Sequence, residues 1–278
     1  MTSEPNALVL SATGLRAWDR CERLFAFTYI YPRPWPGPQG TDPQLSERRT
    51  SLGTQLHHLI HQHALGLDSR SLARTDPDLR RWFERYRASA YAALDGPVYS
   101  ELHLSASVGD MVVRATFDRV IQRGSEFVIV DWKTSERLPD ARVLADDWQA
   151  LLYPFVLAEV GSALNGGVAI APEAIKMVFY YVEHGQEVVI PHDSERHEGV
   201  RANLLWVMAS MARSGYEPTG KQGQRCLKPA PCRFYSLCHL ADTRIEAQVA
   251  DDDVPEVDPD DYLALLPEYE FDDEPVSL

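Results

Sequence analysis

Two acidic residues and a lysine stand close together in the middle of the chain, in the segment ATFDRVIQRGSEFVIVDWKTS. Asp118 falls within the first of two apolar runs, and Asp131 and Lys133 follow the second. Residues two apart on a strand project from the same face, so this pattern places Asp131 beside Lys133. A carboxylate at the end of a buried apolar strand is costly unless it is neutralised. The spacing therefore indicates a site where a cation balances two carboxylates.

A hard divalent cation suits such a pair, because Mg²⁺ binds carboxylate oxygens and keeps several of its waters. A lysine beside the ion is placed to hold or activate a nucleophilic water. The plainer interpretation is a strand-end ion pair between Asp131 and Lys133, with Asp118 a turn residue. On the D-x-K tripeptide alone that interpretation is favoured, since such tripeptides occur by chance. Other motifs have to decide between the two.

Two helical segments supply further polar candidates. In GTQLHHLIHQHA, His57 offers an imidazole, a softer ligand that suits Mn²⁺ or a mixed site. A surface or packed histidine is the alternative, since other histidines share this stretch. In DWQALLYPF, Gln149 and Tyr153 are four residues apart and share a helix face, which directs them at DNA or at the lysine. An amphipathic helix packed on a sheet explains them equally well.

The chain has four cysteines, and three of them are spaced six residues apart near its C-terminal end. Clustered cysteines in a reducing compartment indicate metal ligands more than disulfides. Four thiolates suit a closed zinc site or an iron–sulfur cluster, and ligand chemistry alone does not choose between them. If all four meet, they join the two ends of the folded chain. They are Cys21, Cys226, Cys232 and Cys238.

Composition is that of a soluble globular protein, with 278 residues of which 45 % are hydrophobic and 24 % charged. No apolar run is long enough to cross a bilayer, and the first residues lack a signal-peptide pattern. We therefore expect a cytoplasmic protein with no membrane partner. The formal net charge of −14 is concentrated in residues 245–278, which hold thirteen acidic residues and no Lys or Arg. The remainder is nearly neutral, so a nucleic-acid partner is not excluded.

The element pattern predicts an α/β fold with a mixed central sheet flanked by helices. Periodicity and turn residues predict one domain over residues 1–244 and an acidic, disordered tail over 245–278. A polar loop is expected from the PRPWPGP run to about residue 50. The expected helices are 11–31, 51–66, 77–95, the segment WQALLYPFVLAEV and 195–214. The expected strands are 99–107, 111–122, 126–132, 174–183 and 186–191.

The order of these motifs resembles the RecB-like branch of the PD-(D/E)XK nuclease superfamily, which includes the RecB and AddB nuclease domains and CRISPR-associated RecB-like exonucleases. The resemblance covers roughly residues 8–240. LSATGLRAWDRCERLFAFTYI resembles the family's opening helix, which carries the first cluster cysteine. Gly53 to His57 resembles its GxxxH motif, Gln149 and Tyr153 match its QxxxY motif, and CRFYSLC resembles its closing cysteine pair.

This resemblance implies a restriction-endonuclease-like core with its N- and C-terminal segments joined by a four-cysteine metal cluster. Lys133 takes the place of the catalytic lysine, acting with Asp118 and Asp131. The four cysteines take the places of the ligands of a four-iron four-sulfur (4Fe-4S) cluster. Zinc stays open as the alternative, because the first two C-terminal cysteines are six apart where the family has a close CxxC pair. The implied ligands of Mg²⁺ or Mn²⁺ are His57, Asp118, Asp131 and the backbone carbonyl of Trp132.

The implied function is a metal-dependent DNA nuclease, an exonuclease acting on DNA ends or single strands. DNA repair, recombination and CRISPR adaptation are each compatible with the family, as is a protein partner in such a complex. The alternative is a non-catalytic DNA-binding or adaptor module that retains the nuclease fold. Basic residues near the cysteines are candidates for phosphate contacts, with plain surface solvation as the alternative. The candidate DNA-binding residues are Gln149, Tyr153, Arg225, Lys228 and Arg233.

Overall fold

The computed structural model describes residues 9–32, 43–67, 76–93, 96–216, 226, 232–235 and 238, with only the backbone given for 43–47 and 49. Its strands are β1 (Val9–Leu10), β2 (Val98–Val108), β3 (Met111–Arg123), β4 (Glu126–Lys133), β5 (Ile175–Tyr181) and β6 (Gln186–Pro191). Its α-helices are α1 (Ala12–Arg20), α2 (Glu22–Phe25), α3 (Pro43–Ala64), α5 (Pro77–Ala88), α6 (Ala141–Ala145), α7 (Trp148–Val160) and α8 (Ser194–Arg213). A π-helical turn, η1 (Ala26–Ile30), and two 3₁₀ turns, η2 (Gly161–Asn165) and η3 (Pro172–Ala174), complete them.

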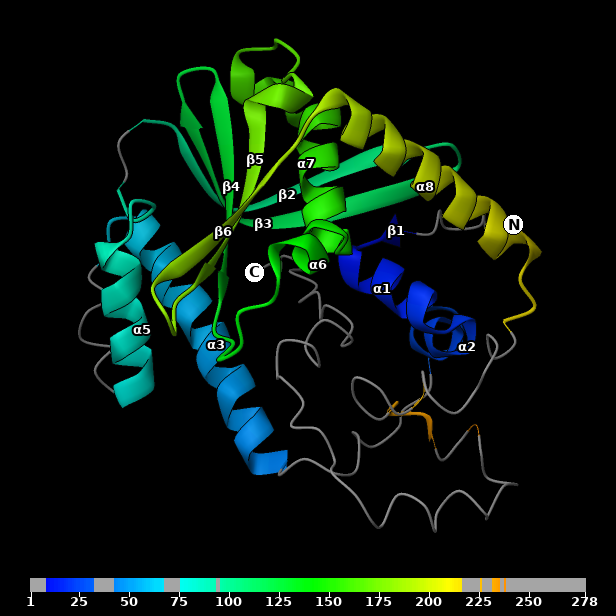
Figure 1. The fold of residues 1–278 in the computed structure, drawn as a ribbon, viewed down its shortest axis with the longest axis horizontal. Helices are drawn as coiled ribbons and strands as arrows, with labels where there is room; N and C mark the ends of the chain where they lie inside the picture. Colours follow the sequence, from blue (N-terminus) through cyan, green and yellow to red (C-terminus); the bar gives the residue numbers. More distant parts are fainter. Residues whose placement is uncertain are drawn as a thin grey trace, which may run out of the picture.

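These strands form one mixed sheet (Figure 1). Its strands run in the order β1, β3, β4, β5 and β6, and β2 lies along the other edge of β3. The pairs β2–β3, β3–β4 and β5–β6 are antiparallel, whereas β1–β3 and β4–β5 are parallel. Glycines with positive φ, Gly109 and Gly124, make the two tight hairpin turns that follow β2 and β3.

Helices cover both faces of the sheet, so the described chain has three layers (Figure 1). One face packs against α1, α7 and α8 through a large apolar core that includes Phe117, Phe155 and Phe179. The opposite face packs against α3 and α5 through a second core that includes Trp82 and Trp132. Burial of these two apolar faces is the main force that holds the layers together. The predicted α/β class with a mixed, helix-flanked sheet is confirmed.

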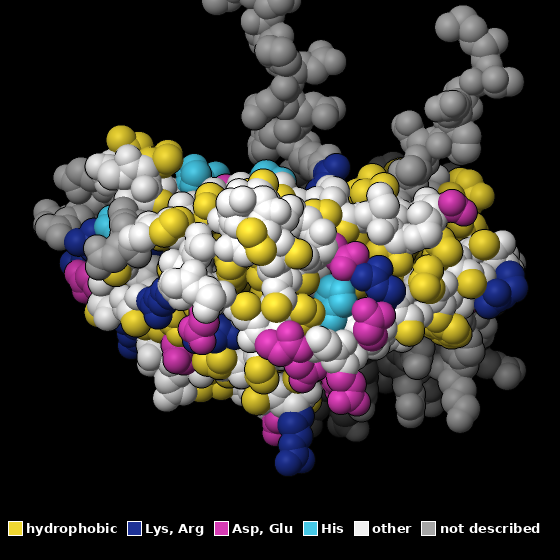
Figure 2. All heavy atoms as spheres, turned by 90° about the horizontal axis from the view of Figure 1, so that it is seen from above, with side chains coloured by type: hydrophobic (Ala, Val, Ile, Leu, Met, Phe, Trp, Pro, Cys, Tyr) yellow, Lys and Arg dark blue, Asp and Glu magenta, His cyan; other side chains and the backbone are white. Residues whose placement is uncertain are grey.

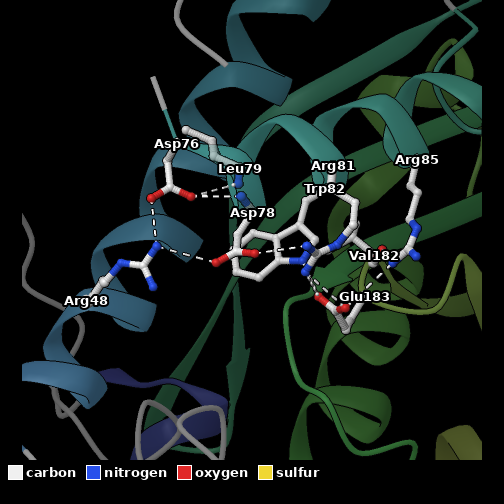
Figure 3. A network of polar contacts seen from close by, with 9 residues as sticks. All are labelled: Arg48, Asp76, Asp78, Leu79, Arg81, Trp82, Arg85, Val182 and Glu183. Atoms are coloured by element: carbon white, nitrogen blue, oxygen red, sulfur yellow. Dashed lines mark hydrogen bonds and ion pairs between the residues drawn. The ribbon is translucent and has the colours of Figure 1, made fainter. Parts of the chain in front are cut away.

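Polar contacts fix α5 to the end of the sheet beyond β5 (Figure 3). Glu183 accepts a hydrogen bond from the indole N–H of Trp82. It also accepts two hydrogen bonds from the guanidinium of Arg81, at 2.8 and 3.1 Å. Asp76 caps the first turn of α5 and also accepts from Arg48 of α3 at 2.8 Å. The two helices are thereby tied to each other and to the strand end that they cover.

Several element boundaries differ from the sequence prediction. The chain is helical from Pro43, where a polar loop was expected up to about residue 50, so His57 lies well inside α3 rather than at its start. The expected single helix over 11–31 is interrupted at Cys21, whose extended backbone separates α1 from α2. The short elements β1 and α6 were not predicted. No helix among the described residues is long and apolar enough to span a membrane.

Candidate active site

The site lies where β3 and β4 separate. Their ladder ends at the pair Arg119–Val130, and continuing that register places Asp118 opposite Asp131 at the first unpaired position. Farther along the same edge of β3, β1 pairs only with Val112 and Val113. Asp118 therefore lies at one end of a stretch of β3 that no strand covers on this edge, among the residues that the structure describes. This fork brings two carboxylates together where the ladder between β3 and β4 ends, and the Asp131 side chain there is buried.

Asp118 joins three elements through one carboxylate oxygen. Its Oδ2 lies 3.2 Å from Nδ1 of His57 on α3, and it accepts a hydrogen bond from the backbone N–H of Trp132 on β4 at 3.1 Å. The sequence-predicted ligands His57, Asp118 and Trp132 are thus neighbours. Since Trp132 is almost fully buried, its backbone is held firmly beside the carboxylate.

Lys133 and Asp131 project together from β4, as the two-residue period predicts. Nζ of Lys133 lies 2.9 Å from Oδ2 of Asp131 and donates a hydrogen bond to Oε1 of Gln149 at 3.0 Å. The amide nitrogen of Gln149 donates to the other carboxylate oxygen, Oδ1 of Asp131. Gln149 therefore bridges the acid and the lysine and fixes the direction in which each points.

Close packing of these groups shifts their acid–base equilibria. Burial works against the protonated form of His57, but the Asp118 carboxylate outweighs it and raises the pKa of His57 to about 9. Burial also opposes ionisation of Asp118, yet the histidine holds its pKa below the usual value. For Asp131, burial dominates and raises the pKa to about 6 despite the neighbouring Lys133. Such opposed shifts within one cluster are typical of functional sites.

The start of α7 positions Gln149. Asp147 caps the helix by accepting from the backbone N–H of Gln149 at 2.8 Å, and the same carboxylate pairs with Arg16 of α1. One turn later, Tyr153 is buried with its ring 5.1 Å from that of Phe117. Gln149 and Tyr153 thus share the face that packs on the sheet, with Gln149 at its polar end. Because both side chains are buried, their predicted part in DNA binding stays a prediction.

Sequence reasoning missed Glu101 on β2. The β2–β3 register places it opposite Asp118, and it interacts electrostatically with Asp118, His57 and Asp131. Burial, followed by the Asp118 charge, raises its pKa to about 7. Its backbone is left-handed, with φ of 53°, which is uncommon for a residue other than glycine. A lone glutamate within a strand pattern gives no sequence signal of this kind.

Sequence reasoning also missed Arg119, which is fully buried next to Asp118. Its guanidinium donates to the carbonyls of Tyr91 at 2.7 Å and Ile60 at 3.3 Å and lies over the ring of Trp132. Ile60 is one turn beyond His57 on α3. The arginine thus anchors the helix that carries the histidine to the strand that carries the aspartate.

The predicted cysteine ligands approach one another at the end of the molecule that contains α2. Cys226 and Cys238 each interact electrostatically with both Cys21 and Cys232. The four thiols therefore lie in one region. All four are free thiols. Burial raises the pKa of Cys232 to about 11.

Aromatic packing holds this C-terminal segment against η1. Phe234 is fully buried with its ring 5.3 Å from that of Phe27, and Arg233 donates to the hydroxyl of Thr28 at 3.1 Å. The two ends of the folded chain therefore meet. Arg233, a predicted DNA-binding residue, is half-buried here. Two others, Arg225 and Lys228, lie outside the described residues, as does the acidic segment 245–278.

The arrangement of the described side chains bears on metal ligation. In this part of the chain, no three or more His, Cys, Asp or Glu side chains are arranged as a metal site. The donor set nevertheless fits a hard cation, because oxygen ligands are what Mg²⁺ and Mn²⁺ prefer. In addition, Oδ2 of Asp131 is buried and accepts no directed hydrogen bond from these residues, having only the Lys133 ammonium nearby. A cation would satisfy this atom.

Comparisons with known proteins identify the family of the chain. The family model described as the PD-(D/E)XK nuclease superfamily matches residues 9–239, and the chain belongs to this superfamily. Membership of its RecB-like branch stays a prediction. No curated protein matches the sequence.

Two solved structures have similar folds at low identity. SSO0001 is 12 % identical over 86 % of this chain and 88 % of its own, with a TM-score of 0.39. A "Putative exonuclease" from Eubacterium rectale is 11 % identical over 84 % of this chain and 88 % of its own, with a TM-score of 0.44. Both scores are below 0.5, so the assignment to the superfamily rests on the family model.

Proposed function

We propose that this chain is a divalent-metal-dependent deoxyribonuclease that hydrolyses phosphodiester bonds of DNA. The observation that carries the proposal is the contact set of Lys133 with Asp131 and Gln149, next to Asp118 and His57 at the fork between β3 and β4. Buried charged side chains are costly unless they are paired or coordinate a metal ion, and Asp131 and Lys133 are paired here. Membership of a nuclease superfamily supports the same reaction.

The cation would be Mg²⁺ or Mn²⁺, held by Asp118, Asp131, His57 and the carbonyl of Trp132. When bound, such an ion activates water and stabilises negative charge on the phosphate. Lys133 holds the attacking water through its ammonium group and offsets the charge that develops on the phosphate oxygens. Gln149 keeps the ammonium aimed at that position, and burial of Asp131 excludes bulk solvent from one side.

We further propose that the four cysteines hold an iron–sulfur cluster, with zinc as the alternative. The four thiols lie in one region, and burial raises the pKa of Cys226, Cys232 and Cys238, which disfavours their ionised forms unless a metal compensates. A cluster there would close the two chain ends around the nuclease core as a structural element. A role in DNA repair or CRISPR adaptation belongs to the same proposal, because it follows from the predicted RecB-like branch. Cytoplasmic localisation is proposed separately, on the lack of a signal-peptide pattern and of a long apolar run in the sequence.

Figure 2 shows one face of the molecule on which a DNA-binding surface could lie. On the face seen there, basic and acidic side chains of the described residues are interspersed with apolar ones and form no continuous basic area (Figure 2). Phosphate binding needs clustered Lys and Arg. The basic residues near the cysteines remain the proposed contacts for the DNA backbone.

The test is cleavage of defined DNA substrates by the pure full-length protein. Labelled linear duplex, linear single strand and closed circular DNA are each incubated with Mg²⁺, Mn²⁺ or EDTA. We expect metal-dependent loss of the linear substrates and protection of the circular ones, which indicates an exonuclease. Cleavage of the circles would indicate an endonuclease instead. Binding without cleavage under every condition would favour the non-catalytic DNA-binding module.

A further inference from the structure

Glu101 lies in one row with the two aspartates of the proposed active site. The register of β2 with β3 runs through Ser100–Arg119 and Leu102–Phe117, which places Glu101 opposite Asp118. The register of β3 with β4 places Asp118 opposite Asp131. Three adjacent strands therefore present three carboxylates at one level of the sheet.

At this level, the side chains of β2 and β3 change the face of the sheet on which they lie. On β2, Val98 packs on the α3 side of the sheet, whereas Leu102, four residues later, packs on the α7 side. On β3, Ile121 packs on the α3 side and Phe117 on the α7 side. A regular strand would keep residues four apart on one face. The left-handed backbone of Glu101 accompanies this switch.

Glu101 is the acidic residue in this row that has no direct contact with a cationic side chain among the described residues, although the charge of His57 acts on it from a distance. Asp118 contacts His57, and Asp131 contacts Lys133. Glu101 makes no hydrogen bond or ion pair with any residue that the structure describes, although it is half-buried. A half-buried, unpaired carboxylate next to two others is unfavourable in the absence of a further positive charge.

We propose that Glu101 supplies a third carboxylate ligand to the divalent cation of the active site. With His57 neutral as a ligand, three carboxylates balance one divalent cation and the Lys133 ammonium. Such an ion keeps several water ligands, and a further carboxylate can take the place of one of them. This inference rests on the proposed function, because it assigns one more ligand to the same ion.

The test measures Mn²⁺ binding to the full-length protein by isothermal titration calorimetry, independently of DNA cleavage. The variants are Glu101→Gln, which keeps the shape, and Glu101→Gly, which suits a left-handed backbone. Glu126→Gln is the matched control, since Glu126 is exposed and pairs with Lys176 at the far end of β4. We expect both Glu101 variants to weaken Mn²⁺ binding at least about tenfold, with the control unchanged.

Stability separates ligation from a structural role. In EDTA, Glu101→Gly should melt no lower than the wild type, because glycine relieves the backbone strain and removes carboxylate repulsion. If either Glu101 variant binds Mn²⁺ as tightly as the wild type, the proposal is overturned.

Asp131→Asn, measured in parallel, tests the proposed metal site itself. Loss of binding in Asp131→Asn but not in the Glu101 variants would overturn only the role of Glu101. Unchanged binding in all three variants, or no binding by the wild type, would overturn the metal site as well.

Discussion

Asp118 and His57 form a pair whose charge state depends on what occupies the site. In the absence of a cation, the Asp118 carboxylate stabilises the protonated imidazole and raises its pKa to about 9. A metal ligand must be neutral imidazole, so cation binding has to displace that proton. Near neutral pH the histidine therefore competes with the metal for Asp118.

This competition predicts a pH dependence of metal-free stability that is specific to His57. A group whose pKa is raised on folding stabilises the protein fully below its unfolded value, about 6.5. That contribution is lost as pH rises through about 9. In EDTA, the wild type should melt above His57→Gln at pH 6, and the gap should shrink steadily toward pH 10. A gap that stays constant over this range would contradict the assigned ion pair.

Two residues of the site illustrate what the sequence predicts and what it cannot. The D-x-K spacing placed Asp131 beside Lys133, because side-chain direction along a strand follows from a period of two. Glu101 could not be found this way. Its position depends on a left-handed backbone that no rule assigns to glutamate, and on a register between strands that residues alone do not specify.

At the scale of elements, the start of α7 sets the geometry of the catalytic face. Asp147 both caps this helix and pairs with Arg16 of α1, so one carboxylate orients α7 relative to its neighbour. Two residues after Asp147, Gln149 forms hydrogen bonds with Lys133 and Asp131. A small change at the cap is thus transmitted directly to Lys133.

Replacement of Asp147 should separate its two roles. Asp147→Ala loses the cap and leaves Arg16 unpaired, so we expect a loss of about 2–3 kcal/mol of unfolding free energy. Asp147→Asn retains a capping oxygen and should lose less. Denaturant titration measures both. Equal stability of the two variants would show that the cap contributes nothing beyond the ion pair.

Gln149→Leu tests the contact between α7 and the lysine at nearly constant volume. The variant removes the hydrogen bonds to Lys133 and Asp131 and leaves the helix in place. We expect kcat for DNA cleavage to fall at least about tenfold with little change in KM, because an interaction that aims a catalytic group acts in the transition state. A rise in KM with unchanged kcat would indicate a direct DNA contact instead.

Most elements of the core were predictable because apolar periodicity and turn glycines determine them locally, as at the β2–β3 hairpin. The beginning of α3 was not, since the segment from Pro43 is polar and its helical conformation is not marked by an apolar pattern. The break at Cys21 was missed for the opposite reason. The apolar pattern continues across it, while the backbone turns to start a second short helix.

At the scale of the whole molecule, Phe27 near the beginning of the described chain packs against Phe234 near its end, in the region of the four cysteines. What binds those cysteines stays a prediction, because thiolate ligands alone suit both zinc and iron.

Cys21→Ser tests the cluster. We expect the purified variant to lose its bound iron and its visible absorbance and to melt at a lower temperature, because ligand binding contributes folding energy. Lys133→Ala is the control and should keep the metal. Zinc in place of iron in the wild type would overturn the cluster type alone, whereas full metal content in Cys21→Ser would exclude that cysteine as a ligand.

The acidic segment 245–278 lies outside the described residues, and its effect is open to a direct test. A solvated tail that aids solubility is one interpretation, and a polyanion that competes with DNA is the other. If the segment competes with DNA, truncation after Arg244 should tighten DNA binding at low salt, and this gain in affinity should shrink as salt screens the charges. Equal affinities across a salt titration would leave only solubility.

The most direct measurement of the central claim is Mg²⁺- or Mn²⁺-dependent DNA cleavage by the wild type, Lys133→Ala and Asp131→Asn. Lys176→Ala on β5 serves as the matched control, because Lys176 also projects from a strand but pairs with Glu126 away from the site. We predict that both site variants lose at least about a hundredfold in kcat while binding DNA, and that the control cleaves normally. Undiminished cleavage by either site variant would contradict the account.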